Sequence, residues 1–393
     1  MSRRVIFADD GNIILANARA SQTTRAFARR GLAQTTWGFC KMSTDSIFIK
    51  ACRREATERT PVWIMRQAGR YLPEYRAIRE KSDFLTLCKT PGLASDVTVQ
   101  PVDIIGVDAA ILFSDILVIP EAMGMKLEIV ESKGPTFDEP LRSVEDIRKL
   151  NTQGVTERLR YVMDAIALTK EKLAGRVPLI GFSGAPWTLA TYMVEGKSTR
   201  NFDIIKGFIY NETAAAHELL QTLADAVVDY LNAKISTGCD AVQIFDTWAG
   251  VLSPSDAEEF SLRYIRYICE NLRTNGSPVI VFAKGVNAFD KLASLNCDVI
   301  GLDWTQDIEK VRSEIGGRKA LQGNLDPCVL FAPKETIRRK VQEILDGFGG
   351  GPGHIFNLGH GILPNTSVEN ARYLVECVKE LSSNYHYKDS AKA

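Results

Sequence analysis

The sequence predicts a single α/β domain folded as a (β/α)8 barrel of the TIM type. Eight short apolar runs each end near a polar or charged residue, and helical patterns lie between most of these runs. Strands that alternate with helices indicate a parallel sheet, and eight such units in a chain of this size close into a barrel. We therefore expect the active site at the C-terminal ends of the strands.

The candidate strands are runs of three to five residues. They cover residues 62–65, 109–113, 178–182, 241–245, 279–283, 298–302, 321–323 and 354–356. The residues that follow them are, in the same order, Arg66, Ser114 and Asp115, Ser183 and Gly184, Asp246 and Thr247, Lys284, Asp303, Asn324, and Asn357. Short apolar runs bounded in this way are typical of strands buried in a parallel sheet.

Helical periodicity covers residues 155–174 and 213–236, where apolar residues recur every three or four positions. Ser253 and Pro254 suit the N-cap and first position of a helix that we expect to reach Leu272.

Two further helices are predicted near the C-terminus. Pro333 is expected to open a helix that Gly347 closes, and residues 366–369 match a capping box before the last helix. The glycine-rich stretch 349–353 precedes a strand, which favours a loop over a phosphate-binding site at a helix N-terminus.

The charge balance, the apolar runs and the cysteines of the chain argue against several classes of protein. The 393 residues include 48 basic and 48 acidic side chains, and this balance argues against a nucleic-acid-binding protein. No apolar run approaches the roughly 18 residues of a membrane-spanning helix, so we expect no membrane association. Eight scattered cysteines without a Cys-x-x-Cys pair indicate reduced, mostly buried thiols in an intracellular protein.

Residues 1–41 differ in composition from residues 42–393, which we assign to the barrel. After Asp10 the segment has no acidic residue until Asp45, while arginines accumulate among small residues. Three interpretations are open: a transit peptide, a disordered tail, or an extension upstream of a true start at Met42. We expect a cytoplasmic protein, or a plastid or mitochondrial one if the segment is a transit peptide.

Arg66 and Arg70 lie at the end of the first predicted strand, on either side of Gln67, Ala68 and Gly69. Guanidinium groups bind carboxylates through paired hydrogen bonds, so two arginines and an amide predict a carboxylate-binding site. The alternative is a loop with two solvated arginines and an internal salt bridge to Glu74.

Asp115 ends the second predicted strand between apolar residues, so its carboxylate must accept hydrogen bonds or take up a proton. Three further candidates follow other strands: Tyr192, Thr247 and His360, the last between two glycines. Each has a structural alternative. The alternatives are a turn cap or an arginine partner for Asp115, a core position for Tyr192, a helix cap for Thr247 and a loop position facing water for His360. For Asp246 the sequence suggests a structural role as the partner of an arginine.

Several motifs resemble the uroporphyrinogen decarboxylase family, over about residues 47–382. They are the stretches 65–75 (Met-Arg-Gln-Ala-Gly-Arg-Tyr-Leu-Pro-Glu-Tyr), 113–116 (Phe-Ser-Asp-Ile), 184–188 (Gly-Ala-Pro-Trp-Thr), 245–250 around Thr247, and 357–361 (Asn-Leu-Gly-His-Gly). They occur in the order that the family shows.

The resemblance implies a homodimeric enzyme that converts the four acetate arms of uroporphyrinogen III to methyl groups, giving coproporphyrinogen III and carbon dioxide without cofactor or metal. It implies that Asp115 binds the pyrrole nitrogens and is catalytic together with Arg66 and Arg70. Gln67, Tyr192, Thr247 and His360 would complete the substrate contacts.

Two other functions remain open. One is a corrinoid methyltransferase of the same barrel superfamily, which usually needs zinc held by His and Cys, and the other is a tetrapyrrole-binding protein without activity. For Lys284 two roles are open, a cation that completes the positive charge of the pocket and a Schiff-base lysine. Asp303 and Asn324 lie at strand ends without an assigned role.

Overall fold

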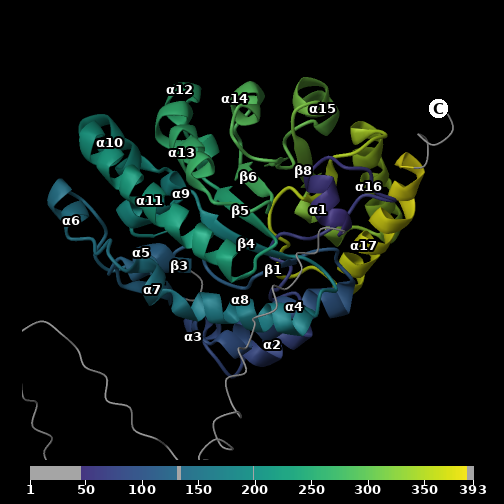
Figure 1. Cartoon of the computed structure of the whole chain (residues 1–393), viewed down its shortest axis with the longest axis horizontal. Helices are drawn as coiled ribbons and strands as arrows, with labels where there is room; N and C mark the ends of the chain where they lie inside the picture. Colours follow the sequence, from purple (N-terminus) through teal and green to yellow (C-terminus); the bar gives the residue numbers. More distant parts are fainter. Residues whose placement is uncertain (1–45, 131–133, 198, 387–393) are drawn as a thin grey trace, which may run out of the picture. The chain divides into compact units, whose positions relative to one another are not determined.

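Seven parallel strands form the central sheet of the computed structural model, which describes residues 46–130, 134–197 and 199–386 (Figure 1). The strands are β1 (Ala110–Ile111), β4 (Leu179–Gly184), β5 (Ala241–Asp246), β6 (Val279–Ala283), β7 (Val299–Gly301), β8 (Ala320–Leu325) and β9 (His354–Leu358), and they pair in this order. Residues 1–41, for which three interpretations are open, lie outside the described residues.

Helices connect the strands and lie along the outer side of the curled sheet (Figure 1). Those before β4 are α1 (Ile47–Cys52), α2 (Pro73–Arg79), α3 (Phe84–Lys89), α4 (Pro91–Ile105), α5 (Val118–Ala122), α6 (Val144–Arg148), α7 (Val155–Arg158) and α8 (Arg160–Leu173). Those after β4 are α9 (Pro186–Glu195), α10 (Asp203–Asn211), α11 (Thr213–Thr237), α12 (Pro254–Asp256), α13 (Arg263–Asn271), α14 (Phe289–Ala293), α15 (Ile308–Ile315), α16 (Lys334–Phe348) and α17 (Val368–Ser382). Short 3-10 segments are η2 (Ala249–Val251), η4 (Pro327–Phe331) and η5 (Ser383–Tyr385), and η3 (Ala257–Leu262) is a π-helical turn.

The first predicted strand, residues 62–65, does not form a regular strand. Val62 makes a single parallel bridge to Phe356 of β9, where the Phe356 amide donates to the Pro61 carbonyl at 2.8 Å. On its other side the Val62 carbonyl accepts the amide of Asp108 at 2.8 Å, two residues before β1. Backbone hydrogen bonds through this segment therefore link the two edges of the seven-stranded sheet.

Side chains replace a strand partner beyond Val62. The Ile64 amide donates to Oε1 of Gln67 at 3.1 Å, and the Met65 amide donates to Oδ1 of Asn357 at 2.9 Å. Because these donors bond to side chains and not to a neighbouring strand, the ladder stops after one bridge.

Three other expectations need correction. Residues 155–174 form two helices, because Leu159 (φ −94°, ψ 17°) interrupts the run between α7 and α8. The helix that was expected to end at Gly347 continues to Phe348, and Gly349 follows it with a φ of 73°, which glycine adopts without steric cost. Ser367 is the N-cap of α17 but makes no side-chain cap hydrogen bond, so the expected capping box does not form.

The helix expected after Ser253 begins as predicted, since Ser253 accepts the amide of Asp256. It continues through the π-helical turn η3 and α13 to Asn271. An antiparallel hairpin of β2 (Leu127–Val130) and β3 (Gly134–Phe137) was not predicted.

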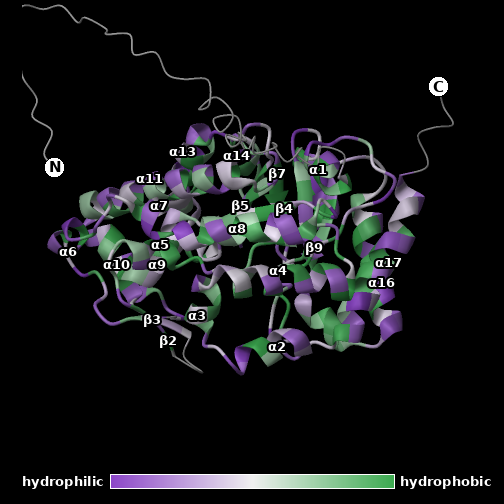
Figure 2. Ribbon diagram, turned by 60° about the horizontal axis from the view of Figure 1, so that its bottom comes forward, coloured by the Kyte–Doolittle hydropathy of each residue, from purple (hydrophilic) through white to green (hydrophobic). Residues whose placement is uncertain are grey.

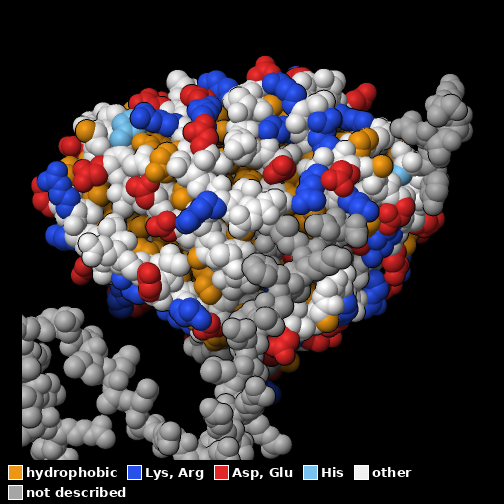
Figure 3. Space-filling view, viewed as in Figure 1, with side chains coloured by type: hydrophobic (Ala, Val, Ile, Leu, Met, Phe, Trp, Pro, Cys, Tyr) orange, Lys and Arg blue, Asp and Glu red, His pale blue; other side chains and the backbone are white. Residues whose placement is uncertain are grey.

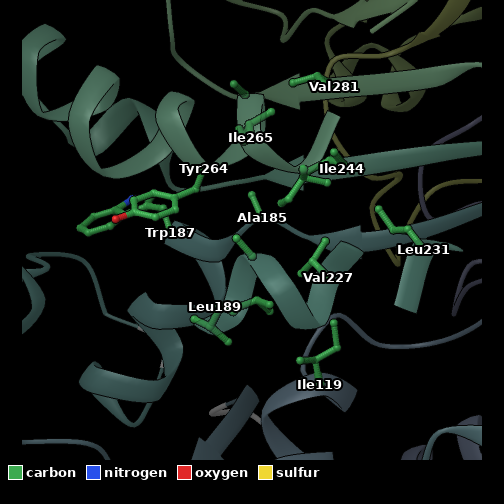
Figure 4. Packing of buried hydrophobic residues seen from close by; sticks show 14 of the residues in the cluster. Ile119, Ala185, Trp187, Leu189, Val227, Leu231, Ile244, Tyr264, Ile265 and Val281 are labelled. Carbon is green, nitrogen blue, oxygen red and sulfur yellow. The ribbon is translucent and has the colours of Figure 1, made fainter. Parts of the chain in front are cut away.

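The core has two layers, one on each face of the sheet. Ile180, Phe182 and Phe245 belong to the inner cluster, whereas alternate residues of the same strands face the helices. Figure 4 shows this outer layer, where Ile244 and Val281 of the strands lie near Val227 of α11 and Ile265 of α13. The ribbon coloured by hydropathy shows hydrophobic residues throughout the sheet and mixed faces on the helices (Figure 2).

The inner face of the sheet also holds a buried polar chain. The Trp63 indole donates to Gln322 of β8 at 2.9 Å, and the Gln322 amide donates to Gln243 of β5 at 3.4 Å. Buried polar groups require such partners, so this chain fixes the position of residue 63 relative to two strands.

The surface of the described residues intersperses acidic and basic side chains on the face shown in Figure 3, in line with the balanced charge. Six of the seven described cysteines are buried, all seven are free thiols, and Cys328 is exposed. In the described part of the chain, no helix combines the length and the apolar character needed to span a membrane.

Lys234 of α11 is completely buried between the helix and the sheet. Its ammonium donates to the carbonyl of Phe182 at 2.6 Å and lies 4.1 Å from the ring centroid of Tyr230. Burial disfavours the charged form and lowers the pKa of Lys234 to about 7. The folded protein therefore loses a proton at a much lower pH than the unfolded chain does.

This difference predicts a pH-dependent stability. Between about pH 7 and pH 10 the unfolded chain binds more protons at position 234, so the contribution of Lys234 to the unfolding free energy rises with pH. We expect Lys234→Met to remove that slope and to raise the unfolding free energy at pH 7 by roughly 2 kcal/mol, the desolvation cost less a hydrogen bond. Urea unfolding at pH 6.5 to 9.5 measures both effects.

The exposed Lys340, which pairs with Glu343 at 2.7 Å on α16, provides the control. Lys340→Met removes the same charge without changing a buried site, so its slope should match the wild type. Equal slopes for Lys234→Met and the wild type would contradict the expectation.

Candidate active site

Polar side chains gather at the edge of the sheet where the strands end. The parallel strands place Arg66, Asp115, Asp246, Thr247, Lys284, Asp303, Asn324 and His360 at or just beyond their C-terminal ends. Because all strands run in the same direction, these residues share one edge, which is where barrel enzymes bind their substrates.

Arg66 stands at the sharp turn that follows residues 61–65. Its backbone has a φ of 62°, a left-handed conformation that a non-glycine residue adopts at some steric cost, and its side chain is exposed. The side chain lies directly against Gly361, because a Cβ atom at that position would overlap Cδ and Cγ of Arg66. The guanidinium stem is thus packed between its own turn and the loop after β9.

Gln67 is fully buried and its amide is committed to the backbone. Oε1 accepts the Ile64 amide at 3.1 Å, and Nε2 donates to the carbonyl of Ala109 at 3.0 Å. The residue expected to contact a substrate therefore ties the Arg66 turn to the residue before β1.

Asn357 performs a similar function from β9. Its Oδ1 accepts the amides of Met65 at 2.9 Å and of Leu358 at 2.7 Å, and the Ile362 amide donates to the Met65 carbonyl at 2.9 Å. No role was predicted for Asn357, although an amide side chain directly after an apolar run indicated a structural partner.

Asp115 lies four residues beyond β1, and its Oδ1 accepts the amide of Leu117 at 2.7 Å. Burial is the largest influence on its carboxyl group and raises its pKa, while the Leu117 amide and the charge of Arg66 act in the opposite direction. The charge of Arg66 therefore favours the anionic form of Asp115. The expected proximity of Asp115 to Arg66 and Arg70 stays a prediction.

His360 is a neutral donor at physiological pH. Burial, Arg66 and Lys284 lower its pKa to about 4, against a smaller opposing effect of Asp303. Its Nδ1 accepts the Gly361 amide at 2.6 Å, which places the proton of the neutral ring on Nε2. Arg66 thus acts electrostatically on both Asp115 and His360.

Arg70 is exposed three residues before α2, and its carbonyl accepts Nη1 of Arg76 at 2.8 Å. Its charge lowers the pKa of Tyr75, although burial dominates there and raises that pKa. The described ion pairs do not include the alternative salt bridge to Glu74. Neither of these interactions links Arg70 to Asp115.

Tyr192 and Thr247 belong to neighbouring segments. Tyr192 of α9 lies 6.2 Å from Trp248, measured between ring centroids, and both Tyr192 and Thr247 are half-buried. The end of β4, just before α9, packs against the Asp115 loop, because a Cβ atom at Gly184 would lie 3.2 Å from Cβ of Ile116.

Asp246, expected as the partner of an arginine, bonds to two hydroxyl groups instead. It is completely buried and accepts Oγ1 of Thr188 at 2.5 Å and Oγ of Ser261 at 2.6 Å. Burial, the strongest influence, raises its pKa to about 6. Asp246 thereby joins α9 and the π-helical turn η3 to the end of β5, and so fixes the neighbouring Thr247.

The described residues contain no cluster of side chains suited to bind a metal ion. Residues 46–130, 134–197 and 199–386 contain no group of three or more His, Cys, Asp or Glu side chains that would hold an ion. The candidate site combines cations, the half-buried carboxylate of Asp115 and the neutral His360.

The influence of Arg66 on His360 is directly testable. Arg66→Met removes a positive charge beside the imidazole, so we expect the pKa of His360 to rise from about 4 toward its ordinary value. Nitrogen NMR of the four histidines as a function of pH measures this shift. His354, whose pKa burial lowers to about 3 without an effect of Arg66, is an internal control and should not move. An unchanged His360 titration would show that the two side chains are not coupled.

Comparison with known proteins identifies the family of this chain. A family model for uroporphyrinogen decarboxylase matches residues 43–381. The uroporphyrinogen decarboxylase of Chloroherpeton thalassium is 54% identical over 351 residues, covering 88% of this chain and 99% of that protein. The enzyme of that name from Chlorobaculum tepidum is 52% identical over 351 residues, with coverage of 88% and 100%.

A solved structure shares the fold at lower identity. A methyltransferase from Methanosarcina mazei superimposes with a TM-score of 0.73 at 22% identity, covering 85% of this chain and 97% of its own. At that identity the similarity concerns the fold alone. The family model and the curated relatives span most of this chain, and the chain therefore belongs to the uroporphyrinogen decarboxylase family.

Proposed function

We propose that this chain decarboxylates the four acetate arms of uroporphyrinogen III and releases coproporphyrinogen III, a step in porphyrin and haem biosynthesis. Family membership supports the reaction class. The observation that carries the proposal is the position of Arg66, whose charge acts on both Asp115 and His360. The charge of Arg66 thus influences both Asp115, whose carboxylate can accept pyrrole N–H groups, and His360, which can donate to carboxylates.

Asp115 is the group that receives the macrocycle in this proposal. A flexible tetrapyrrole turns its N–H donors inward, and one carboxylate accepts several of them. Burial raises the pKa of Asp115 and so disfavours its carboxylate form, and N–H donors from a bound ligand would stabilise that form.

The acidic arms would bind to the remaining residues. Arg66 and Arg70 supply guanidinium groups, and Tyr192, Thr247 and the Nε2–H of His360 supply neutral donors. We propose that Gln67 acts through the Arg66 turn, because both of its amide atoms already bond to the backbone.

The chemistry requires an electron sink, and the pyrrole ring provides one. Protonation of a ring carbon gives a cation, the bond between the acetate methylene and its carboxylate breaks, and the electron pair of that bond neutralises the ring. A second proton at the methylene carbon and loss of the ring proton leave a methyl group and carbon dioxide. The anion of Asp115 would stabilise the cationic intermediate, so we propose that the reaction needs no cofactor.

Three aromatic rings lie close together on the inner face of the sheet. Phe182 and Phe245 meet edge to face with centroids 5.7 Å apart, and Phe282 lies 6.0 Å from Phe245. These rings belong to the inner face of the sheet beneath the strand ends. An apolar wall lowers the local dielectric constant and strengthens the attraction between a carboxylate and a nearby cation.

Residues 61–65 would complete an eight-stranded (β/α)8 barrel. The bonds of this segment to Phe356 on one side and to Asp108 on the other support closure. We propose that residues 42–393 form this one barrel domain and that residues 1–41 are an extension of it.

We also propose that the enzyme is a homodimer that acts in the cytoplasm, or in a plastid or mitochondrion if residues 1–41 direct import. Light scattering on the purified full chain determines the first point, and a fluorescent protein fused to residues 1–41 tests the second.

Replacement of Asp115 tests the reaction. Asp115→Ala and the isosteric Asp115→Asn both remove the anion, so we expect kcat/KM for uroporphyrinogen to fall by roughly 10³-fold or more. Anaerobic incubation followed by chromatography of the oxidised porphyrins measures the loss of each carboxyl group. The thermal midpoint should stay at or above the wild-type value, because a buried charge has been removed.

The control is Asp164→Asn, which removes an exposed carboxylate that pairs with Arg160 on α8. Its kcat/KM should equal that of the wild type. Full activity of Asp115→Asn would overturn the role of the anion, and a wild-type chain that binds uroporphyrinogen without producing coproporphyrinogen would identify a binding protein.

A further inference from the structure

Lys284 is a cation at the edge of the site that the proposed mechanism does not use. It directly follows β6, and its ammonium lies 5.1 Å from the ring centroid of Trp304, which follows β7. A cation over an indole face is attracted by the ring, so this contact holds the flexible lysine in one region.

Trp304 connects Lys284 to the loop after β9. Its ring centroid lies 6.2 Å from that of His360, and Gly359 packs so closely on the Trp304 backbone that no side chain would fit there. Three loops, after β6, β7 and β9, therefore bring an ammonium, an indole and an imidazole together. Trp304 remains 38% exposed, so this group is reached from outside.

The lysine has no carboxylate partner in the described part of the chain. The ion pairs of residues 46–386 that the structure describes do not include Lys284. Asp303, the acid nearest to this group in sequence, is already engaged. Its Oδ2 accepts the Gly285 amide at 2.7 Å, and its Oδ1 accepts the amide of Thr305 at 2.9 Å and its hydroxyl at 2.5 Å.

The backbone of Lys284 is fixed by the same elements that position Thr247. Its amide donates to the carbonyl of Asp246 at 3.0 Å, and Gly250 packs against its carbonyl so closely that an added Cβ atom would lie 2.7 Å away. Lys284 is thus anchored at its backbone by β5 and at its ammonium by Trp304.

We propose that Lys284, held on the face of Trp304 beside His360, binds a carboxylate arm of the substrate. This inference rests on the proposed function, because it takes an acetate or propionate arm of a tetrapyrrole as the ligand. The substrate carries eight carboxylates, and two arginines neutralise only part of that charge. An ammonium that lacks an acidic partner supplies a further charge at the point where the strands end.

Variants of Lys284 test the proposal. For Lys284→Met we expect KM for uroporphyrinogen to rise roughly tenfold while kcat stays within about twofold, as for a contact present in both ground and transition states. Lys284→Arg retains the charge and should restore KM to within about threefold of the wild type. Lys340→Met, with the same loss of charge on the outside of α16, should leave KM unchanged.

Coproporphyrinogen III identifies which arm is bound, because it retains the propionates and lacks the acetates. Anaerobic titration with this product should show roughly tenfold weaker binding to Lys284→Met if a propionate contacts the lysine. Unchanged product binding together with a raised KM identifies an acetate. Either result supports the site. An unchanged KM, or a fall in kcat alone, overturns it.

The role of Lys284 can be tested even if the wild-type chain does not decarboxylate uroporphyrinogen. A wild-type chain without turnover is titrated with uroporphyrinogen directly, and the dissociation constants of Lys284→Met and Lys284→Arg then decide the role of the lysine. Equal dissociation constants for the wild type and Lys284→Met overturn the proposal independently of catalysis.

Discussion

The attachment of residues 61–65 to β9 and to the residues before β1 is the constraint on which the site depends. Backbone bonds at Val62 hold one end of this segment, and the side chains of Gln67 and Asn357 hold the other. A buried amide without a partner costs about 1–3 kcal/mol, so these two side chains stabilise a turn that a regular ladder would not permit. Arg66 stands at the end of this turn and is thereby directed toward both Asp115 and His360.

The electrostatics of the site follow from burial and from that one cation. Burial raises the pKa of Asp115 and lowers that of His360, so both neutral forms are favoured by desolvation. Arg66 opposes the first effect and reinforces the second. The charge of Arg66 thus favours the anionic form of Asp115 and the uncharged form of His360. A protein with no net charge can in this way present a locally positive site for acidic ligands.

The sequence allowed most of the strands to be predicted, because an apolar run with a polar terminus depends on neighbouring residues only. The prediction for residues 279–283 agrees with β6 at both ends. The sequence was less informative about which polar side chains at the strand ends belong to the candidate site. Gln67 and Asp246 bond to segments far away in the chain, and such partners are not visible in local patterns. The same reason explains why residues 62–65 looked like a strand, although two of their amides bond to side chains.

The close packing of Gly359 and Gly361 limits which substitutions the loop after β9 can accept. One is pressed against the backbone of Trp304 and the other against the side chain of Arg66, so neither position has room for even a methyl group. At Gly359 the contact is with backbone atoms of Asp303 and Trp304, which no substitution removes, whereas at Gly361 a shorter side chain in place of Arg66 would make room. A laboratory library that diversifies the loop after β9 should therefore keep Gly359 fixed and vary position 361 only together with position 66.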